Sequence, residues 1–322
     1  MRSTISIASV VFSLVTVTAA QSWKDPSPHR EQMISVDDNV QLEVLDWGGS
    51  GRPMVLVTGL GNTAHVFDDF APRLASLGHV YGITRRGYGK SSAPADGYGA
   101  ERLGMDVLRV LDALKLERPI MVAHSIGGQE LSFLGSRHPD RVAGLIYLDA
   151  AYDYAFWLDP SPLAEKPPGP MRPPAGDGSE LKSVEAFRAR SMQVRGFVAP
   201  EAELRQQFEV HADGSIGPPR TPPHVGKAIN SGSGRTYTFV KPPSLAIFAS
   251  PHHPGPFAEQ DQAALAAFLR FDEMLVERQA QSIEKALPNV RVVRLPRANH
   301  YVFLSHPEDV LREMRVFIEA LK

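Results

Sequence analysis

The chain has 322 residues, of which 43% are hydrophobic and 22% charged, and its formal net charge is −2 at pH 7. This near balance argues against nucleic acid or an anionic membrane surface as the main partner. The absence of cysteine excludes disulfides, thiolate metal sites and a cysteine nucleophile. The length allows one large α/β domain, or such a domain carrying an inserted segment.

The N-terminus predicts a secretory signal peptide over residues 1–20. Arg2 precedes an apolar stretch over 5–17, and small residues then lead into polar Gln21. A charged start, a short apolar region and a small-residue end are typical of such peptides. The apolar run is short for a membrane span. We therefore expect an exported, soluble protein, periplasmic or secreted, without stable membrane insertion after cleavage; an uncleaved interfacial anchor is the alternative.

The first half of the remaining chain alternates strands and helices. Continuous or alternating apolar runs predict strands over 33–36, 40–47, 54–57, 80–84, 119–123 and 142–148. Helical spacing predicts helices over 67–77, 101–114 and 128–138. Strands that alternate with helices indicate a mostly parallel sheet flanked by helices on both faces.

The alternation is interrupted over residues 150–243. This segment is rich in proline, with helical stretches near 179–195 and 200–209 and a tight turn within 210–216. It is too long for a plain loop, so we expect an inserted helical, Pro-rich lid. The pattern resumes with strands 244–249 and 290–295 and with helices across 258–286 and 307–321. The core is thus expected over 21–149 and 244–322, with eight strands in all.

Ser125 is the candidate nucleophile. It stands in Ala123-His124-Ser125-Ile126-Gly127, directly after a predicted buried strand and before a predicted helix. Small residues at 123 and 127 suit a tight turn that presents a serine hydroxyl above a sheet. The N-terminus of the following helix favours an anionic intermediate. The alternative is an ordinary turn with a capping serine.

His300 is the candidate general base. A serine nucleophile needs a base, and the base needs an orienting carboxylate. Ligands of parallel α/β sheets bind at the carboxyl ends of the strands, so each partner should directly follow a strand. His300 comes just after the predicted strand 290–295.

Asp149 is the favoured orienting acid, because it ends the last strand before the inserted segment. The loop after strand 244–249 is the commoner source, but it carries no carboxylate before Glu259. Asp153 and Asp261 remain alternatives. A helix-capping role is the other interpretation of Asp149.

An oxyanion requires backbone N–H donors. The amide of Ile126, directly after the nucleophile, is one candidate. Leu60 in the glycine-rich loop Thr58-Gly59-Leu60-Gly61 is the other. A plain glycine turn is the alternative for that loop.

Taken together, these residues resemble the α/β-hydrolase superfamily over nearly the whole mature chain. Residues 58–61 match its oxyanion loop, although Thr58 stands where His is usual, and 86–91 look like its Arg-Gly-x-Gly-x-Ser turn. Residues 123–127 match its nucleophile elbow, and Asn299-His300 stands where Gly-His is typical. The main departure is the missing acid after strand 244–249; some branches use a strand-end acid at the position of Asp149.

The resemblance implies a serine hydrolase acting on a small-molecule, ester-type substrate, with a Ser125-Asp149-His300 triad and no cofactor or metal. A serine nucleophile argues against dehalogenation and epoxide opening. The alternatives are a C–C, lactone or amide hydrolase, an acyltransferase, or a non-catalytic ligand-binding protein on the same scaffold. The sequence leaves the oligomeric state open.

Several other residues receive a structural interpretation. His252 and His253, with His211 and His224, match no metal-ligand spacing and are predicted to be solvated loop residues. Arg85-Arg86 is predicted to form structural salt bridges. Four aromatic residues are expected either to line a substrate pocket or to pack the lid on the core: Tyr152, Tyr154, Phe156 and Trp157.

Overall fold

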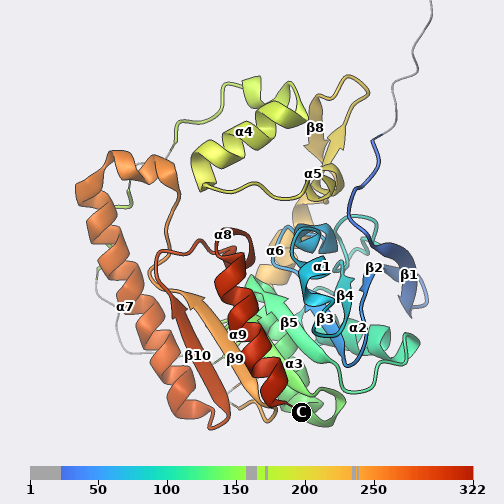
Figure 1. Cartoon of the computed structure of the whole chain (residues 1–322). Coiled ribbons are helices and arrows are strands. Elements are labelled where there is room, and N and C mark those ends of the chain that lie inside the picture. Colours follow the sequence, from blue (N-terminus) through green and yellow to red (C-terminus); the bar gives the residue numbers. More distant parts are fainter. Residues whose placement is uncertain (1–22, 157–164, 171–172, 234–236, 238, 322) are drawn as a thin grey trace, which may run out of the picture.

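A computed structural model describes residues 23–156, 165–170, 173–233, 237 and 239–321 (Figure 1). The expected signal peptide, residues 1–20, and Trp157 lie outside the described residues. Among the helices that the structure describes, none is both long enough and apolar enough to cross a membrane.

The described residues contain an eight-stranded sheet in the order β1-β2-β4-β3-β5-β6-β9-β10. Its strands are β1 (Arg30–Asp37), β2 (Val40–Gly48), β3 (Pro53–Val57), β4 (His79–Ile83), β5 (Ile120–His124), β6 (Gly144–Leu148), β9 (Ser244–Ala249) and β10 (Val290–Leu295). The β1–β2 and β2–β4 pairs are antiparallel, and every other neighbouring pair is parallel. This confirms the predicted mostly parallel sheet.

Two groups of helices cover the sheet. Helices α2 (Ala100–Ala113), α3 (Gly128–Arg137) and α7 (Gln262–Ala286) contribute to one apolar core. The other core includes α1 (Ala71–Leu74), α8 (Val302–Ser305) and α9 (Pro307–Ala320). Helices on both faces explain why β5, β6 and β9 are buried along their whole length.

The prediction of one helix over 67–77 is wrong in the extent of that helix. The chain instead forms a short 3-10 helix, η1 (Ala64–Phe67), and then the four-residue α1. Pro72 stands at the start of α1. Because proline lacks a backbone N–H and clashes with the preceding turn, it cannot lie within one continuous helix here.

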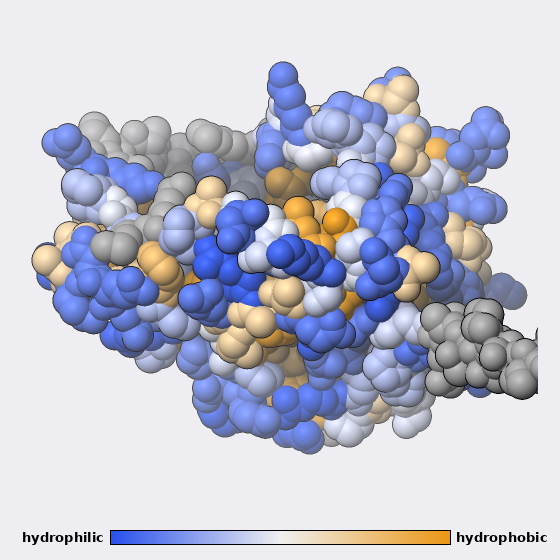
Figure 2. Space-filling view, turned by 90° about the horizontal axis from the view of Figure 1, so that it is seen from above, coloured by the Kyte–Doolittle hydropathy of each residue, from blue (hydrophilic) through white to orange (hydrophobic). Residues whose placement is uncertain are grey.

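The segment between β6 and β9 contains three α-helices, a short 3-10 helix (Ser179–Leu181) and a hairpin among its described residues. The α-helices and the strands of the hairpin are α4 (Val184–Arg195), α5 (Glu201–Gln207), β7 (Phe208–Val210), β8 (Ile216–Pro219) and α6 (Pro223–Ser231). Figure 1 shows α4, α5 and β8 together above the main sheet. Figure 2 looks down on this face and shows apolar side chains at its middle, within mostly hydrophilic surroundings.

The Arg85-Arg86 pair forms buried salt bridges, as predicted. The Nε of Arg85 lies 2.7 Å from Oε1 of Glu130 on α3, and the Nε of Arg86 lies 2.6 Å from Oδ2 of Asp106 on α2. All four side chains are almost fully buried. The two pairs therefore tie the end of β4 to two helices of the first core.

Helix α3 begins in close contact with the chain that follows β6. A Cβ added at Gly128 would lie 1.9 Å from the carbonyl oxygen of Ala150. We therefore expect Gly128→Ala to lower the free energy of unfolding by about 2 kcal/mol or more, because the backbone must move apart. Chemical denaturation measures this change. The matched control is Gly226→Ala in α6, where an added Cβ meets nothing within 4 Å; equal stabilities of the two variants would contradict the expectation.

Candidate active site

The loops after five of the parallel strands carry the residues of the candidate site at the carboxyl ends of those strands. Four predicted residues lie there: Leu60 after β3, Ser125 after β5, Asp149 after β6 and His300 after β10. His252 follows β9 at the same edge. Because parallel strands end on the same side of a sheet, residues that are distant in sequence come together here.

The turn that carries Ser125 has a strained backbone. Ser125 has a φ of 53°, in the left-handed region that residues with a side chain rarely adopt. Its neighbours leave room only for small residues: a Cβ at Gly127 would lie 2.7 Å from the carbonyl oxygen of Thr58, and one at Gly59 would lie 3.0 Å from Ser125 Cβ. The turn thus has the tight geometry that small residues at 123 and 127 predict.

Ser125, His300 and Asp149 form one hydrogen-bonded chain. The Nε2 of His300 lies 2.9 Å from the hydroxyl of Ser125, and its Nδ1 lies 2.6 Å from Oδ2 of Asp149. With the proton on Nδ1, the ring donates to the carboxylate and accepts from the hydroxyl. Asp261, an alternative acid in the sequence, instead caps α7 by accepting from the amide of Ala264.

Asp149 has further partners. Its Oδ1 accepts hydrogen bonds from the amide of Ala249 at 2.9 Å and from the hydroxyl of Tyr152 at 2.7 Å. Its Oδ2 also lies 2.7 Å from Nε2 of His252. Complete burial acts to raise the pKa of Asp149, but His252 and His300 outweigh it and hold the pKa well below its usual range. The carboxylate is therefore ionised.

The prediction that His252 is a solvated loop residue is wrong. Its Nδ1 and its backbone amide both contact Oδ2 of Asp272 on α7, at 2.9 and 2.6 Å. Burial acts to lower the pKa of His252, but Asp149 and Asp272 raise it to about 10. The sequence did hold one signal that His252 belongs to the site, because His252 closely follows a strand that ends at this edge of the sheet. Its partner Asp272 stands on a helix, where no motif marks it.

The raised pKa of His252 predicts a pH-dependent contribution to stability. A group whose pKa is higher in the folded state stabilises the fold below its unfolded pKa, near 6.5, and that stabilisation is lost as pH rises through about 10. We expect His252→Gln to be less stable than the natural protein at pH 6, and the deficit to shrink by about 1 kcal/mol or more by pH 10.5. Denaturant titrations across this pH range measure the free energy of unfolding of both proteins. The exposed His211→Gln is the control; a pH-independent deficit for His252→Gln would contradict the expectation.

The candidate oxyanion loop is held by Arg85. Its guanidinium donates to the carbonyl oxygen of Thr58 at 2.8 Å and to that of Gly59 at 3.3 Å. In a trans peptide, the N–H of Leu60 points opposite to the carbonyl of Gly59, and therefore away from Arg85. Ile126, the other predicted donor, directly follows Ser125 at the entry to α3.

A cavity of about 260 Å³ lies between this loop and the segment above the sheet. Its walls include Leu60 and Tyr301 on one side and Phe187, Arg195 and Phe197 on the other. The cavity is therefore bordered by the predicted oxyanion loop, at Leu60, and by Tyr301, which follows His300 in the chain.

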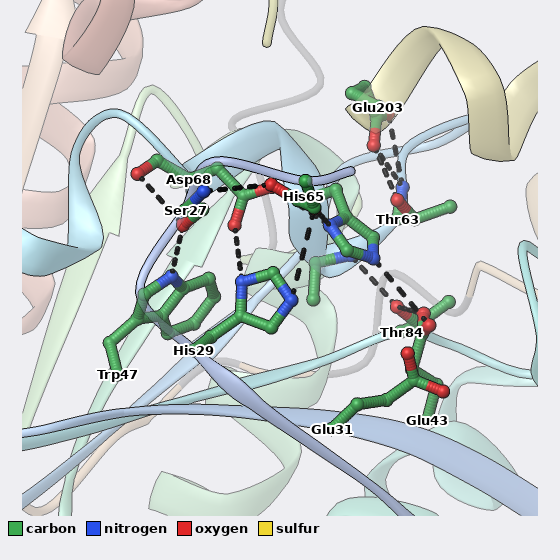
Figure 3. Close-up of polar contacts among 12 residues, drawn as sticks. Ser27, His29, Glu31, Glu43, Trp47, Thr63, His65, Asp68, Thr84 and Glu203 are labelled. Atoms are coloured by element: carbon green, nitrogen blue, oxygen red, sulfur yellow. Dashed lines mark hydrogen bonds and ion pairs between the residues drawn. The ribbon is translucent and has the colours of Figure 1, made fainter. Parts of the chain in front are cut away.

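Glu203 of α5 connects this segment to the loop after β3. Its carboxyl group accepts from the hydroxyl of Thr63 at 2.5 Å and from Nδ2 of Asn62 at 2.9 Å, as Figure 3 shows for Thr63. Burial raises the pKa of Glu203 to about 7. The sequence offered no signal for this contact, because Glu203 is one of several acidic residues on a short helix.

The three described aromatic residues after β6 have different surroundings. Tyr152 bonds to Asp149, a contact that the sequence did not predict. Tyr154 packs against the apolar cluster that includes Ile126, the residue after the candidate nucleophile, and burial raises its pKa well above the usual value. Phe156 is buried in the core with Tyr147.

Comparisons with known proteins identify the fold family of the chain. A family model described as alpha/beta hydrolase fold matches residues 52–307. A pimeloyl-acyl-carrier-protein methyl ester esterase of Neisseria meningitidis is 26% identical over 278 residues, covering 84% of this chain and 94% of the esterase. A non-heme chloroperoxidase of Streptomyces lividans is 27% identical over 161 residues, which are 48% of this chain and 52% of that protein. Some curated relatives match over as little as 37% of their length.

A 2-(acetamidomethylene)succinate hydrolase is similar in both sequence and structure. The protein of that name from Mesorhizobium japonicum is 24% identical over 280 residues, covering 84% of this chain and 90% of the hydrolase. The crystal structure of an E-2-(acetamidomethylene)succinate hydrolase superposes with a TM-score of 0.63 at 21% identity, over 90% of this chain and 99% of that one.

Proposed function

The chain belongs to the alpha/beta hydrolase fold family, and on this basis we propose that it is a serine hydrolase that cleaves carboxylic ester bonds. The observation that carries the proposal is the hydrogen-bonded chain from Ser125 through His300 to the buried, ionised Asp149. Nucleophile, base and orienting carboxylate are the groups that acyl transfer to serine requires.

In the proposed reaction, the Oγ of Ser125 attacks the ester carbonyl while Nε2 of His300 takes the hydroxyl proton. Asp149 stabilises the resulting imidazolium. The amides of Leu60 and Ile126 donate to the oxyanion of the tetrahedral intermediate. The intermediate expels the alcohol, which receives the proton from His300, and leaves an acyl-enzyme. Water then attacks the acyl group with His300 as base, releasing the acid and free Ser125.

Hydrolysis of another acyl bond is the second candidate. The relative named for 2-(acetamidomethylene)succinate covers most of this chain, as does the methyl ester esterase. The same serine, base and oxyanion donors serve ester, lactone and amide carbonyls, which differ in the leaving group that His300 must protonate.

We also propose that residues 150–243 form a lid and that residues 1–20 direct export. Support for the lid comes from the cavity between α4, α5 and the loop after β3, and from the contact of Glu203 with Thr63. Support for export is the charged, apolar and small-residue order of the N-terminus. Cell fractionation and N-terminal sequencing of the mature protein test the second point; an intact precursor in the cytosol would contradict it.

A panel of p-nitrophenyl esters of increasing acyl length tests the function. We expect short acyl chains to be preferred, because a cavity of about 260 Å³ is smaller than most pockets for drug-sized ligands. Matched lactones and amides are assayed in parallel, together with labelling by a fluorophosphonate. Turnover of amides or lactones alone would favour the second candidate. Absence of both turnover and labelling would overturn the assignment as a serine hydrolase.

A further inference from the structure

A second cluster of histidines and carboxylates shares no residue with the candidate active site. It consists of Asp25 and His29, in the segment that leads into β1, and of His65 and Asp68, in and directly after η1. Figure 3 shows both imidazole rings directed toward Asp68. We propose that these four residues, here called the N-terminal cluster, bind one divalent transition-metal ion, for which Zn²⁺ fits best.

The donor atoms lie close enough together to bind one ion. Each residue offers one ligand atom, and all four atoms lie within 4.8 Å of one another. The Nδ1 of His65 is 3.2 Å from Oδ2 of Asp25 and 2.8 Å from Oδ2 of Asp68, and the Nδ1 of His29 is 3.2 Å from Oδ1 of Asp68. Metal–ligand distances of about 2.0 Å place neighbouring ligands of a tetrahedral site about 3.3 Å apart. Two nitrogen and two oxygen donors are a set that Zn²⁺ accepts.

Two of these donor atoms lack a hydrogen-bond partner. The Nδ1 of His29 and Oδ1 of Asp68 are both buried, and although they are 3.2 Å apart they make no well-directed hydrogen bond. Buried polar atoms are nearly always paired with protein or with another ligand. A cation bound between them would satisfy both lone pairs at once.

Glu43 of β2 supplies the outer contact that metal-binding histidines usually have. The second ring nitrogen of such a histidine commonly donates to a carboxylate, which orients the ring. The Nε2 of His65 lies 3.6 Å from Oε1 of Glu43, and both atoms are buried and without a hydrogen-bond partner. Thr84 donates to the other oxygen of Glu43 at 2.6 Å and so holds the carboxylate in place. With Nδ1 on the metal, His65 would direct its Nε2–H at Glu43.

The charges around the site also favour a divalent ion. Three carboxylates, from Asp25, Glu43 and Asp68, face the two rings. The ammonium group of half-exposed Lys90 lies 4.0 Å from Oε1 of Glu43. An ion with two positive charges would interact favourably with these carboxylates, of which Glu43 and Asp68 are buried. It would also tie the segment before β1 to η1, which follows the loop carrying Leu60.

Metal binding to the full chain, measured without reference to activity, tests the proposal. Protein freed of metal by a chelator is titrated with ZnCl₂ by calorimetry, and with Co²⁺, whose visible absorption reports tetrahedral coordination. We expect one ion per chain and at least about tenfold weaker binding in His29→Gln and in Asp25→Asn. The matched control is His79→Gln, because that ring pairs with Asp46 outside the cluster. Circular dichroism shows whether each variant is folded, and Asp25→Asn serves if His29→Gln is not.

A second variant separates this site from the active site. Asp149, His252 and His300 also place donor atoms within 4.8 Å of one another. The proposal requires that His252→Gln keep the high-affinity ion that His29→Gln loses. Loss of the ion in His252→Gln with retention in His29→Gln would overturn it. So would the absence of binding to the natural protein at about 0.1 mM Zn²⁺, which would leave the N-terminal cluster as a network of ion pairs.

Discussion

Ser125→Ala should lower kcat/KM for the best substrate by on the order of 10⁵ to 10⁶, and should abolish labelling by a fluorophosphonate. The reason is that the alanine variant retains His300, Asp149 and the backbone donors but has no oxygen to form the acyl-enzyme. The residual rate would come from binding and from stabilisation of the oxyanion. Steady-state kinetics with the ester panel, together with gel-based detection of the probe, measure both effects.

Ser132→Ala is a matched control for this experiment. Ser132 is a buried serine on α3, and its hydroxyl lies 3.2 Å from that of Tyr147 rather than near His300. We expect it to change kcat/KM by only a few fold. Full activity of Ser125→Ala, or equal losses in the two variants, would show that Ser125 is not the nucleophile.

Asp149→Asn should lower kcat by about 10⁴-fold. The change removes the negative charge that stabilises the imidazolium and turns one acceptor oxygen into an NH₂ group. That group would face the nitrogens of His300 and His252, which now contact Oδ2. His300 would then favour the wrong tautomer and could no longer accept the proton of Ser125.

The alternative acids provide controls for Asp149. Asp261→Asn should retain nearly full activity, because asparagine also caps helices and Asp261 accepts from the amide of Ala264 at the start of α7. The same activity measurement on Asp153→Asn tests the other alternative acid. If either of these variants loses more activity than Asp149→Asn does, the assignment of the orienting acid to Asp149 fails.

Local sequence patterns predicted the sheet well and the short helices less well. The apolar runs of β3, β5, β6 and β9 stand out because each strand is buried on both faces. The region 67–77 misled the prediction because its apolar spacing is helical, whereas Pro72 prevents one continuous helix. The candidates Leu60, Ser125, Asp149 and His300 were chosen because each lies at or after the end of a predicted strand.

The sequence by itself determined the family, the order of the eight main-sheet strands along the chain, and the tight turn at Ser125. These depend on periodicity and on residues that are close neighbours in the chain. Only the tertiary structure decided that Asp149 rather than Asp261 contacts His300, that His252 shares that carboxylate, and that His29 and His65 converge on Asp68. Such pairs join residues of separate loops and helices. Which charges meet depends on how the packed sheet and helices bring those loops together, and no pattern within one segment records it.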